Sequence, residues 1–312
     1  MNETATGDLA GRVAIVTGGG RGIGAAIVHG LHARGAAVVV ADSGTSIGGD
    51  GADPGVATGL VDRLGARAAA FTESIASPSA AKALVDAAVD RFGCLDIVVS
   101  NAAILRDAFV FRADPYDWDA VIANNLSAAF YLLAAATPVL RDNGKAGRGG
   151  AGGYDWGRIV TVVSTAGLYG NYGQSAYAAA KAGLVGLTRV AALDMARARV
   201  TANAVAPFAH TRVTDTIKPA NDAQAAYKER ALKVGAEHVG NLVGWLAGSD
   251  AGDVSGQVFG VRGREVFLFS QPRPKRRAVL ADAGWGAVRR ELEAGFVPLE
   301  TDLEAFNTEP VV

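Results

Sequence analysis

Short apolar runs, rich in valine, isoleucine and alanine, alternate along this chain with longer segments of helical periodicity. Residues 12–17 (RVAIVT) and 36–41 (AAVVVA) hardly alternate between apolar and polar side chains, which is typical of strands buried on both faces. Strands that alternate with helices build a parallel sheet covered by helices on both faces. The expected strands are 12–17, 36–41, 67–72, 96–100, 158–163, 201–206 and 256–261, and the expected helices are 22–34, 55–64, 79–92, 115–141, 175–196 and 236–247.

The 312 residues suit one large α/β domain or two small ones. We expect a single domain over 1–270 and a C-terminal extension over 271–312, which is too short to be an independent domain. The extension, with a helix over 286–296, is expected to pack on the main body or on a partner subunit. Three segments interrupt the alternation: a Gly/Asp loop at 43–55, a glycine-rich surface insertion at 143–157 and a helical segment at 208–235.

Composition and charge argue against several classes of function. The 30 basic and 31 acidic residues leave a net charge of −1, so we expect no nucleic-acid partner. No uninterrupted apolar run reaches roughly 18 residues, and the first residues lack the pattern of a signal peptide; we therefore expect no membrane span and a cytoplasmic protein. The single cysteine, Cys94, is expected to be a buried, unreactive thiol. Histidines and carboxylates show no metal-ligand spacing, so no metal is expected.

A glycine loop joins the first expected strand to the first expected helix. Gly18, Gly22 and Gly24 follow the strand in the order G-x-x-x-G-x-G. Glycine allows a tight turn and a close backbone approach to a pyrophosphate, and the following helix N-terminus supplies amide donors and a positive dipole end. Because the loop stands between a strand and a helix, it predicts a dinucleotide site in a single-domain, Rossmann-like doubly wound parallel sheet of about seven strands.

An aspartate ends the second expected strand. Asp42 stands 24 residues after Gly18, at a distance typical of the carboxylate that binds the adenosine ribose hydroxyls. The same charge would repel a 2′-phosphate, so Asp42 favours NAD over NADP. Arg21 inside the glycine loop favours NADP instead, because a nearby arginine can bind the 2′-phosphate. A loop-capping role is the alternative for Asp42.

Four motifs occur together and in order: TGGGRGIG (17–24), SNAAI (100–104), NNLSAAF (124–130) and STAGLYGNYGQSAYAAAK (164–181). In this combination the chain resembles the short-chain dehydrogenase/reductase family from about residue 9 to residue 263. The chain resembles more closely the (3R)-hydroxyacyl-CoA dehydrogenase part of multifunctional enzyme type 2. It also resembles related bacterial hydroxyacyl-CoA and hydroxysteroid dehydrogenases. Segments 101–119, 167–187, 203–216 and 267–274 carry this likeness.

The resemblance implies an alcohol:NAD(P) oxidoreductase with four catalytic residues, Asn125, Ser164, Tyr177 and Lys181. It also implies that Asn125 helps to carry a water-linked proton path to the tyrosine and lysine. Together with the glycine loop and Asp42, the expected cofactor-binding residues are Gly18, Arg21, Gly22, Ile23, Gly24, Asp42, Ser74, Ile75, Asn101, Ala102, Tyr177 and Lys181.

Three positions depart from the family pattern. Ala103 replaces a glycine and adds a methyl group near the cofactor. The segment APFAHT (206–211) lacks the usual Pro-Gly, which leaves the nicotinamide-side contacts there unassigned. The segment TESIAS (72–77) replaces an aspartate-hydrophobic pair, so Ser74 and Ile75 are the expected neighbours of the adenine.

The chemistry of the tyrosine depends on its neighbours. A free tyrosine has a pKa near 10 and is a poor base at neutral pH. Tyr177 and Lys181 are spaced i and i+4, which places them on one helix face, and a nearby ammonium favours the phenolate. Ser164 ends a strand, at the sheet edge where open α/β sheets bind ligands. Individually these residues are ordinary helix and strand-end residues; only their combination indicates catalysis.

The expected substrate is a hydrophobic secondary alcohol or ketone, because the segments that should border the pocket, 108–111, 167–173 and 208–235, are apolar and aromatic. An NADPH-dependent 3-oxoacyl or carbonyl reductase is the first alternative. A catalytically inactive dinucleotide sensor or scaffold is the second. The family resemblance also implies a homodimer or homotetramer that packs through the helices at 115–141 and 175–196.

Overall fold

The computed structural model describes residues 7–148, 153–215, 222–280 and 284–312, which form one eight-stranded sheet in the order β3-β2-β1-β4-β5-β6-β7-β8. Neighbouring strands from β3 to β7 are parallel, and β8 is antiparallel to β7. The predicted α/β fold is therefore confirmed. The strands are β1 Val13–Thr17, β2 Ala37–Ala41, β3 Ala68–Phe71, β4 Ile97–Ser100, β5 Arg158–Val162, β6 Thr201–Phe208, β7 Val258–Arg262 and β8 Glu265–Leu268.

The eighth strand is absent from the predicted set. A tight turn at Gly263, with φ of +59°, reverses the chain and pairs Arg262 with Glu265. A left-handed φ of this kind is readily adopted only by glycine. The residues that follow alternate in burial, with Val266 and Leu268 exposed. Such a one-sided pattern is typical of an edge strand rather than of the strands buried on both faces.

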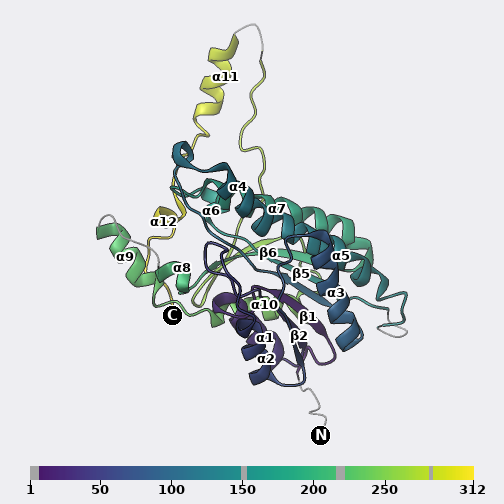
Figure 1. Cartoon of the computed structure of the whole chain (residues 1–312). Helices are drawn as coiled ribbons and strands as arrows, with labels where there is room; N and C mark the ends of the chain where they lie inside the picture. The colour runs from purple at the N-terminus through teal and green to yellow at the C-terminus, as the bar shows by residue number, and fades with distance from the viewer. Residues whose placement is uncertain (1–6, 149–152, 216–221, 281–283) are drawn as a thin grey trace.

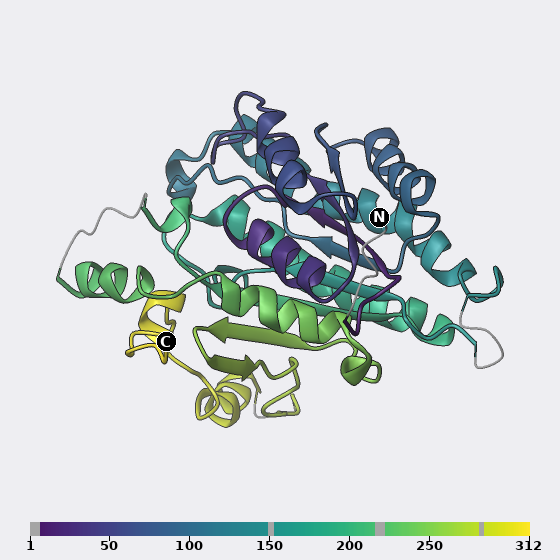
Figure 2. The same cartoon turned by 90° about the horizontal axis from the view of Figure 1, so that it is seen from below.

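Helices cover both faces of the sheet, as the alternation predicts (Figure 2). On one face, α1, α2 and α10 share a core with β1, β2 and β7. On the other face, α3, α5 and α7 pack over β1, β4 and β5. The longer helices are α1 Gly22–Ala33, α2 Gly55–Leu64, α3 Pro78–Phe92, α4 Pro115–Ile122, α5 Ala128–Asp142, α7 Ser175–Met195, α9 Asp222–Ala231, α10 Glu237–Ala247 and α11 Gly284–Glu293; α6 Ala166–Tyr169, α8 Arg212–Asp215 and α12 Asp302–Ala305 are single turns.

The helix expected over 115–141 is continuous but changes its winding in the middle. A π-helical turn, η2 Ala123–Ser127, separates α4 from α5. Such turns are found most often at functional sites. By length and composition alone the span Pro115–Asp142 could cross a membrane, a test that core helices of a folded domain also pass. In this structure Leu132 and Leu140 of that span are buried in the core beneath α3 and α7.

The described residues of the 143–157 insertion are hydrogen-bonded to the sheet, unlike those of the loosely attached surface loop that the sequence predicts. Asp96, which is fully buried, accepts hydrogen bonds from Tyr154 Oη at 2.6 Å and from Arg148 Nη2 at 2.7 Å. Cys94 lies beside this carboxylate, and burial raises the pKa of its thiol to about 11. Cys94 is thus a buried thiol as predicted, and the two ends of the insertion are tied to the sheet by charge-assisted bonds.

The C-terminal extension leaves the body and returns to it. After β8 the chain runs out to α11, which projects from the molecule, and then comes back to α12 beside α6 (Figure 1). The helix expected over 286–296 is α11, two residues earlier at its start. Arg262 holds the returning segment by donating to the carbonyl oxygens of Phe306 at 2.9 Å and Thr308 at 3.1 Å.

Candidate active site

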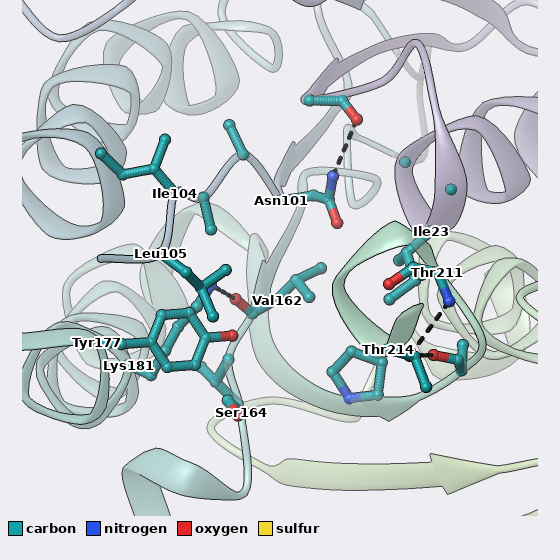
Figure 3. Close-up of a pocket in the computed structure, with 18 of the residues that line it drawn as sticks. Ile23, Asn101, Ile104, Leu105, Val162, Ser164, Tyr177, Lys181, Thr211 and Thr214 are labelled. Carbon is teal, nitrogen blue, oxygen red and sulfur yellow. Dashed lines mark hydrogen bonds between the residues drawn. The ribbon is translucent and has the colours of Figure 1, made fainter. Parts of the chain in front are cut away.

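A cavity of about 690 Å³ opens at the carboxyl ends of the parallel strands. The strand order reverses between β1 and β4, which is the place where doubly wound sheets bind their ligands. In Figure 3, Ser164, Tyr177 and Lys181 lie on one side of this cavity and Ile23 and Thr211 on the other. Every expected cofactor-binding residue and three of the four expected catalytic residues line it: Gly18, Arg21, Gly22, Ile23, Gly24, Asp42, Ser74, Ile75, Asn101, Ala102, Ser164, Tyr177 and Lys181.

The glycine loop leaves no room for side chains at two of its positions. Gly18 has φ of +61°, and a Cβ there would lie 2.9 Å from the Cα of Ala102. At Gly24 a Cβ would lie 1.9 Å from the carbonyl oxygen of Gly18. Both contacts are with backbone, which cannot move aside. The loop therefore folds tightly at the N-terminus of α1, where a helix favours the negative charge of a pyrophosphate, and Gly18, Gly22 and Gly24 line the cavity.

Asn101 fastens the loop after β4 to this glycine loop. Its side-chain Nδ2 donates to the carbonyl oxygen of Thr17 at 2.9 Å and to that of Gly18 at 3.2 Å (Figure 3). In return the Thr17 hydroxyl accepts from the backbone N–H groups of Asn101 and Ala102. These bonds fix the two walls between which a dinucleotide would lie.

Asp42 lies at the end of β2 with both carboxylate oxygens engaged. Oδ2 accepts from the Gly20 N–H at 3.0 Å, and Oδ1 accepts from the Gly44 N–H at 2.8 Å. Asp42 thus caps its loop and also lines the cavity, so the two readings of this residue are compatible. Nearby, Arg21 and Arg212 both donate to the carbonyl oxygen of Thr45, at 2.7 Å and 3.4 Å.

Tyr177 and Lys181 share one face of α7, and Ser164 follows β5. The Lys181 ammonium donates to the carbonyl oxygen of Val162 at 2.7 Å and lies 5.7 Å from the centre of the Tyr177 ring. The Ser164 hydroxyl oxygen accepts from the N–H of Ala166 at 3.2 Å, and its proton is directed toward the Tyr177 hydroxyl, which it would share with a substrate oxygen placed between the two side chains. The two hydroxyl-bearing side chains face the same part of the cavity (Figure 3).

Burial disfavours the charged forms of both titratable groups in this cluster. It raises the pKa of Tyr177 to about 12, while the Ser164 hydroxyl acts in the opposite direction and the charges of Asp107 and Asp302 add to the rise. Burial also lowers the pKa of Lys181 to about 8. Perturbed groups that converge on one cavity are typical of active sites.

Asn125 lies behind the cavity wall rather than in it. The residue is buried in the π-helical turn, and both ends of its amide bind the main chain of Ile104. In this structure it therefore holds the loop that carries Asn101 and Ala102. Its neighbour Asn124 lines the cavity instead.

The expected segment 208–235 contributes Phe208 and Tyr227 to the cavity wall, whereas Asp107, Asp302 and Phe306 were not expected from the sequence. The rings of Phe208 and Phe306 pack in a tilted arrangement with 4.7 Å between their centres. Phe306 and Asp302 belong to the extension, which no local motif assigns to the site. The capping box Thr301–Glu304 was a readable signal for a helix start there, but not for its position.

A nicotinamide dinucleotide fits the part of the cavity beside the glycine loop. Gly18 and Gly24 leave no room for side chains there, and the N-terminus of α1 favours the charge of a pyrophosphate. Residues 12–225 match the model of the short chain dehydrogenase family. The chain belongs to the short-chain dehydrogenase/reductase family and is an oxidoreductase that uses a nicotinamide dinucleotide. Among the described residues, no group of three or more His, Cys, Asp and Glu side chains is arranged to hold a metal ion.

Within this family, the chain is similar to several individual proteins. The chain is 40% identical over 283 residues to the hydroxyacyl-CoA dehydrogenase ChsB1 of Mycobacterium tuberculosis, covering 90% of this chain and 87% of that protein. It is 38% identical over 212 residues to the peroxisomal multifunctional enzyme type 2 of Drosophila melanogaster, covering 67% of this chain and 33% of that protein. A short chain dehydrogenase from Mycobacterium avium superposes with a TM-score of 0.77 at 36% identity, covering 95% of this chain and 99% of that one. The predicted likeness to hydroxyacyl-CoA dehydrogenases is confirmed.

Proposed function

We propose that this protein is an NAD-dependent dehydrogenase that interconverts a secondary alcohol and a ketone on a hydrophobic 3-hydroxyacyl-CoA-like or hydroxysteroid-like substrate. The observation that carries the proposal is the position of Ser164, Tyr177 and Lys181 in the same cavity as the glycine loop. The relative named as the hydroxyacyl-CoA dehydrogenase ChsB1 supports the acyl-CoA class of substrate.

In the proposed reaction the substrate hydroxyl lies between the side chains of Tyr177 and Ser164. Tyr177, as phenolate, accepts the hydroxyl proton, and Ser164 donates a hydrogen bond to the oxygen as it becomes a carbonyl. The bound dinucleotide supplies the acceptor for the hydride that leaves the carbinol carbon. Lys181 and the positive charge of the oxidised nicotinamide favour the phenolate, which offsets the effect of burial on Tyr177.

The walls of the cavity suit an apolar substrate beside the reacting carbon. Phe208 and Phe306 form a tilted aromatic pair on the wall that includes β6, and Ile104 and Leu105 line the side near α4. Apolar walls with a few convergent polar groups are usual for small-molecule sites.

Asp42 supports NAD as the preferred dinucleotide, because its negative charge in the cavity wall at the end of β2 would repel a 2′-phosphate. An NADPH-dependent 3-oxoacyl or carbonyl reductase is the second candidate. Arg21 and Arg212 favour it, since both guanidinium groups converge on Thr45 close to Asp42. Activity with the two dinucleotides separates these candidates, and strong preference for NADPH would overturn the first.

The catalytic assignment is tested by the variant Tyr177→Phe, with Tyr116→Phe as a control because the Tyr116 side chain is 83% exposed. We expect Tyr177→Phe to lose about 100-fold or more of the oxidation rate for a 3-hydroxyacyl-CoA, since the acid–base group is gone. Binding of NADH, followed by its fluorescence, should persist in both variants. Unchanged turnover in Tyr177→Phe would refute the assignment, whereas a wild type that binds NADH and turns over no alcohol would favour a dinucleotide sensor.

We also propose a homodimer or homotetramer built through α5 and α7. Phe130 on α5 and Val190 and Leu193 on α7 expose apolar side chains, at 52%, 52% and 77% of their surface. Burying them against a second copy would remove this surface from water. Sedimentation at micromolar concentration should find a dimer or tetramer; a monomer alone would contradict the proposal.

A further inference from the structure

Asp302, a residue of the C-terminal extension, forms part of the wall of the active-site cavity. Its side chain is almost fully buried, with 8% of the residue exposed. Oδ2 accepts a hydrogen bond at 2.8 Å from the hydroxyl of Thr165, which directly follows the proposed catalytic Ser164. Asp302 is thereby attached to the part of the chain that holds the substrate oxygen.

The second carboxylate oxygen lacks a hydrogen bond of ordinary geometry. Oδ1 of Asp302 is buried and receives none from the described residues, although the backbone N–H groups of Asp302 and Leu303 lie close enough to lower the pKa of the carboxyl, which burial raises. No lysine, arginine or histidine within the described segments comes close enough to form an ion pair with it. A buried acceptor in this state is unfavourable, and its place in a cavity wall fits a ligand that supplies a donor.

The position of Asp302 is fixed by its surroundings rather than by a flexible tail. The capping box of Thr301 and Glu304 starts α12 at this residue. Phe306, one turn on, packs against Tyr169, Phe208, Phe267 and Phe269. With Arg262 clamping the carbonyl oxygens of Phe306 and Thr308, the carboxylate is held at a set place in the wall.

The charge of Asp302 acts on the reaction centre. It is one of the charges that raise the pKa of Tyr177, and it also raises the pKa of Tyr227 on the neighbouring helix α9. An anionic group on the substrate, close to the reacting carbon, would be repelled by the same Asp302 carboxylate. A negative charge on this side of the cavity would disfavour an anionic substrate.

We propose that Asp302 is a specificity-determining residue: its Oδ1 accepts a hydrogen bond from an N–H donor of a neutral acyl derivative, and its charge excludes the free carboxylic acid. This inference rests on the proposed function, in which the substrate is an acyl thioester. The pantetheine arm of such a thioester carries amide N–H groups a few atoms beyond the sulfur. A free 3-hydroxy acid has a carboxylate where the thioester is neutral.

The test compares three ligands with one 3-hydroxyacyl chain and different ends: an N-methylamide, a methyl ester and the free acid. Their dissociation constants are measured by calorimetry on the full-length protein loaded with NADH, a dead-end complex in which no turnover occurs. We expect the wild type to bind the amide best and the acid worst. In Asp302→Asn the acid should bind about tenfold tighter and the amide should lose about fivefold against the ester.

Stability and two further variants complete the test. The variant Asp302→Asn keeps a hydrogen-bond partner for Thr165 and removes a buried charge, so its melting temperature should be no lower than that of the wild type. Asp302→Ala removes the acceptor as well and should abolish the preference for the amide. Glu300→Gln removes one charge from an exposed residue of the same segment and should leave all three constants unchanged.

Equal ratios of the three constants in the wild type and Asp302→Asn would overturn the inference, as would a wild type that binds none of the ligands. Turnover of a 3-hydroxyacyl-CoA is measured separately. If that turnover is absent while the ratios change as expected, the proposed substrate fails and the role of Asp302 stands.

Discussion

The side-chain amide of Asn125 makes two hydrogen bonds with the main chain of Ile104: Nδ2 donates to the carbonyl oxygen at 2.8 Å, and Oδ1 accepts from the N–H at 2.8 Å. The pair joins the π-helical turn to the loop after β4. A π-turn at this point rotates Asn125 toward that loop, which carries Asn101 and Ala102 at the cofactor side of the cavity.

Replacing Asn125 by alanine leaves both polar groups of Ile104 without a partner. We expect the free energy of unfolding to fall by about 2–4 kcal/mol, and NADH to bind more weakly because the loop loses its support. Urea unfolding and fluorescence titration measure the two effects. Asn124→Ala removes only one bond, to the Ala120 carbonyl oxygen, and should cost less stability. Equal losses in the two variants would contradict this role for Asn125.

The charge of Asp42 is expected to set the choice of dinucleotide. In Asp42→Asn the side chain keeps its shape while the repulsion of a 2′-phosphate disappears, and Arg21 and Arg212 remain nearby. We expect the ratio of kcat/KM for NADP to that for NAD to rise about tenfold. Asp53→Asn, an exposed change in the same loop, is the control. A ratio that does not move would show that Asp42 acts only as a loop cap.

The pH dependence of alcohol oxidation should follow the ionisation of Tyr177. Burial raises its pKa to about 12, and the Asp107 charge contributes in the same direction. Because the phenolate is the reactive form in oxidation, kcat/KM should increase with pH. Asp107→Asn removes a negative charge, lowers the pKa of Tyr177 and moves the rise to lower pH, so the rate at neutral pH should increase about threefold.

The control for this profile is Asp90→Asn, because Asp90 is exposed on α3, away from the cavity. It should leave the profile in place. A shift of the Asp107→Asn profile to higher pH would mean that another group limits the reaction.

The tight turn of the glycine loop predicts a large effect at Gly24. A Cβ at this position would lie 1.9 Å from the carbonyl oxygen of Gly18, so Gly24→Ala must displace the loop. We expect dinucleotide binding to weaken by about ten- to 100-fold. In Gly59→Ala the Cβ would meet only the Arg63 side chain at 3.9 Å, within α2, and the melting temperature should rise. Unaltered binding in Gly24→Ala would contradict the fit of the dinucleotide.

Local patterns were sufficient to predict the fold, and their combination along the chain, through the family resemblance, predicted the proposed catalytic group. Tyr177 and Lys181 stand one helical turn apart, and the glycines follow a buried strand directly, so the spacing in sequence is also the spacing in space. The parallel strands were readable because burial on both faces gives continuous apolar runs.

Other features depend on contacts that no local pattern contains. The burial of Tyr154 depends on Asp96, 58 positions away, and the place of Asp302 depends on Thr165, 137 positions away. The π-turn at Asn125 changes the winding without changing the periodicity that a helix prediction uses. The reversal at Gly263 adds an edge strand whose alternation differs from that of the other strands.

The hydrogen bond between Thr165 and Asp302 also has a consequence for co-translational folding. Chains emerge N-terminal part first and begin to fold while synthesis continues. The glycine loop, Ser164 and Tyr177 can assemble early, whereas the wall that contains Asp302 must wait until 137 more residues have been translated after Thr165. A nascent chain would thus acquire its capacity to hold a dinucleotide before it acquires its choice of substrate.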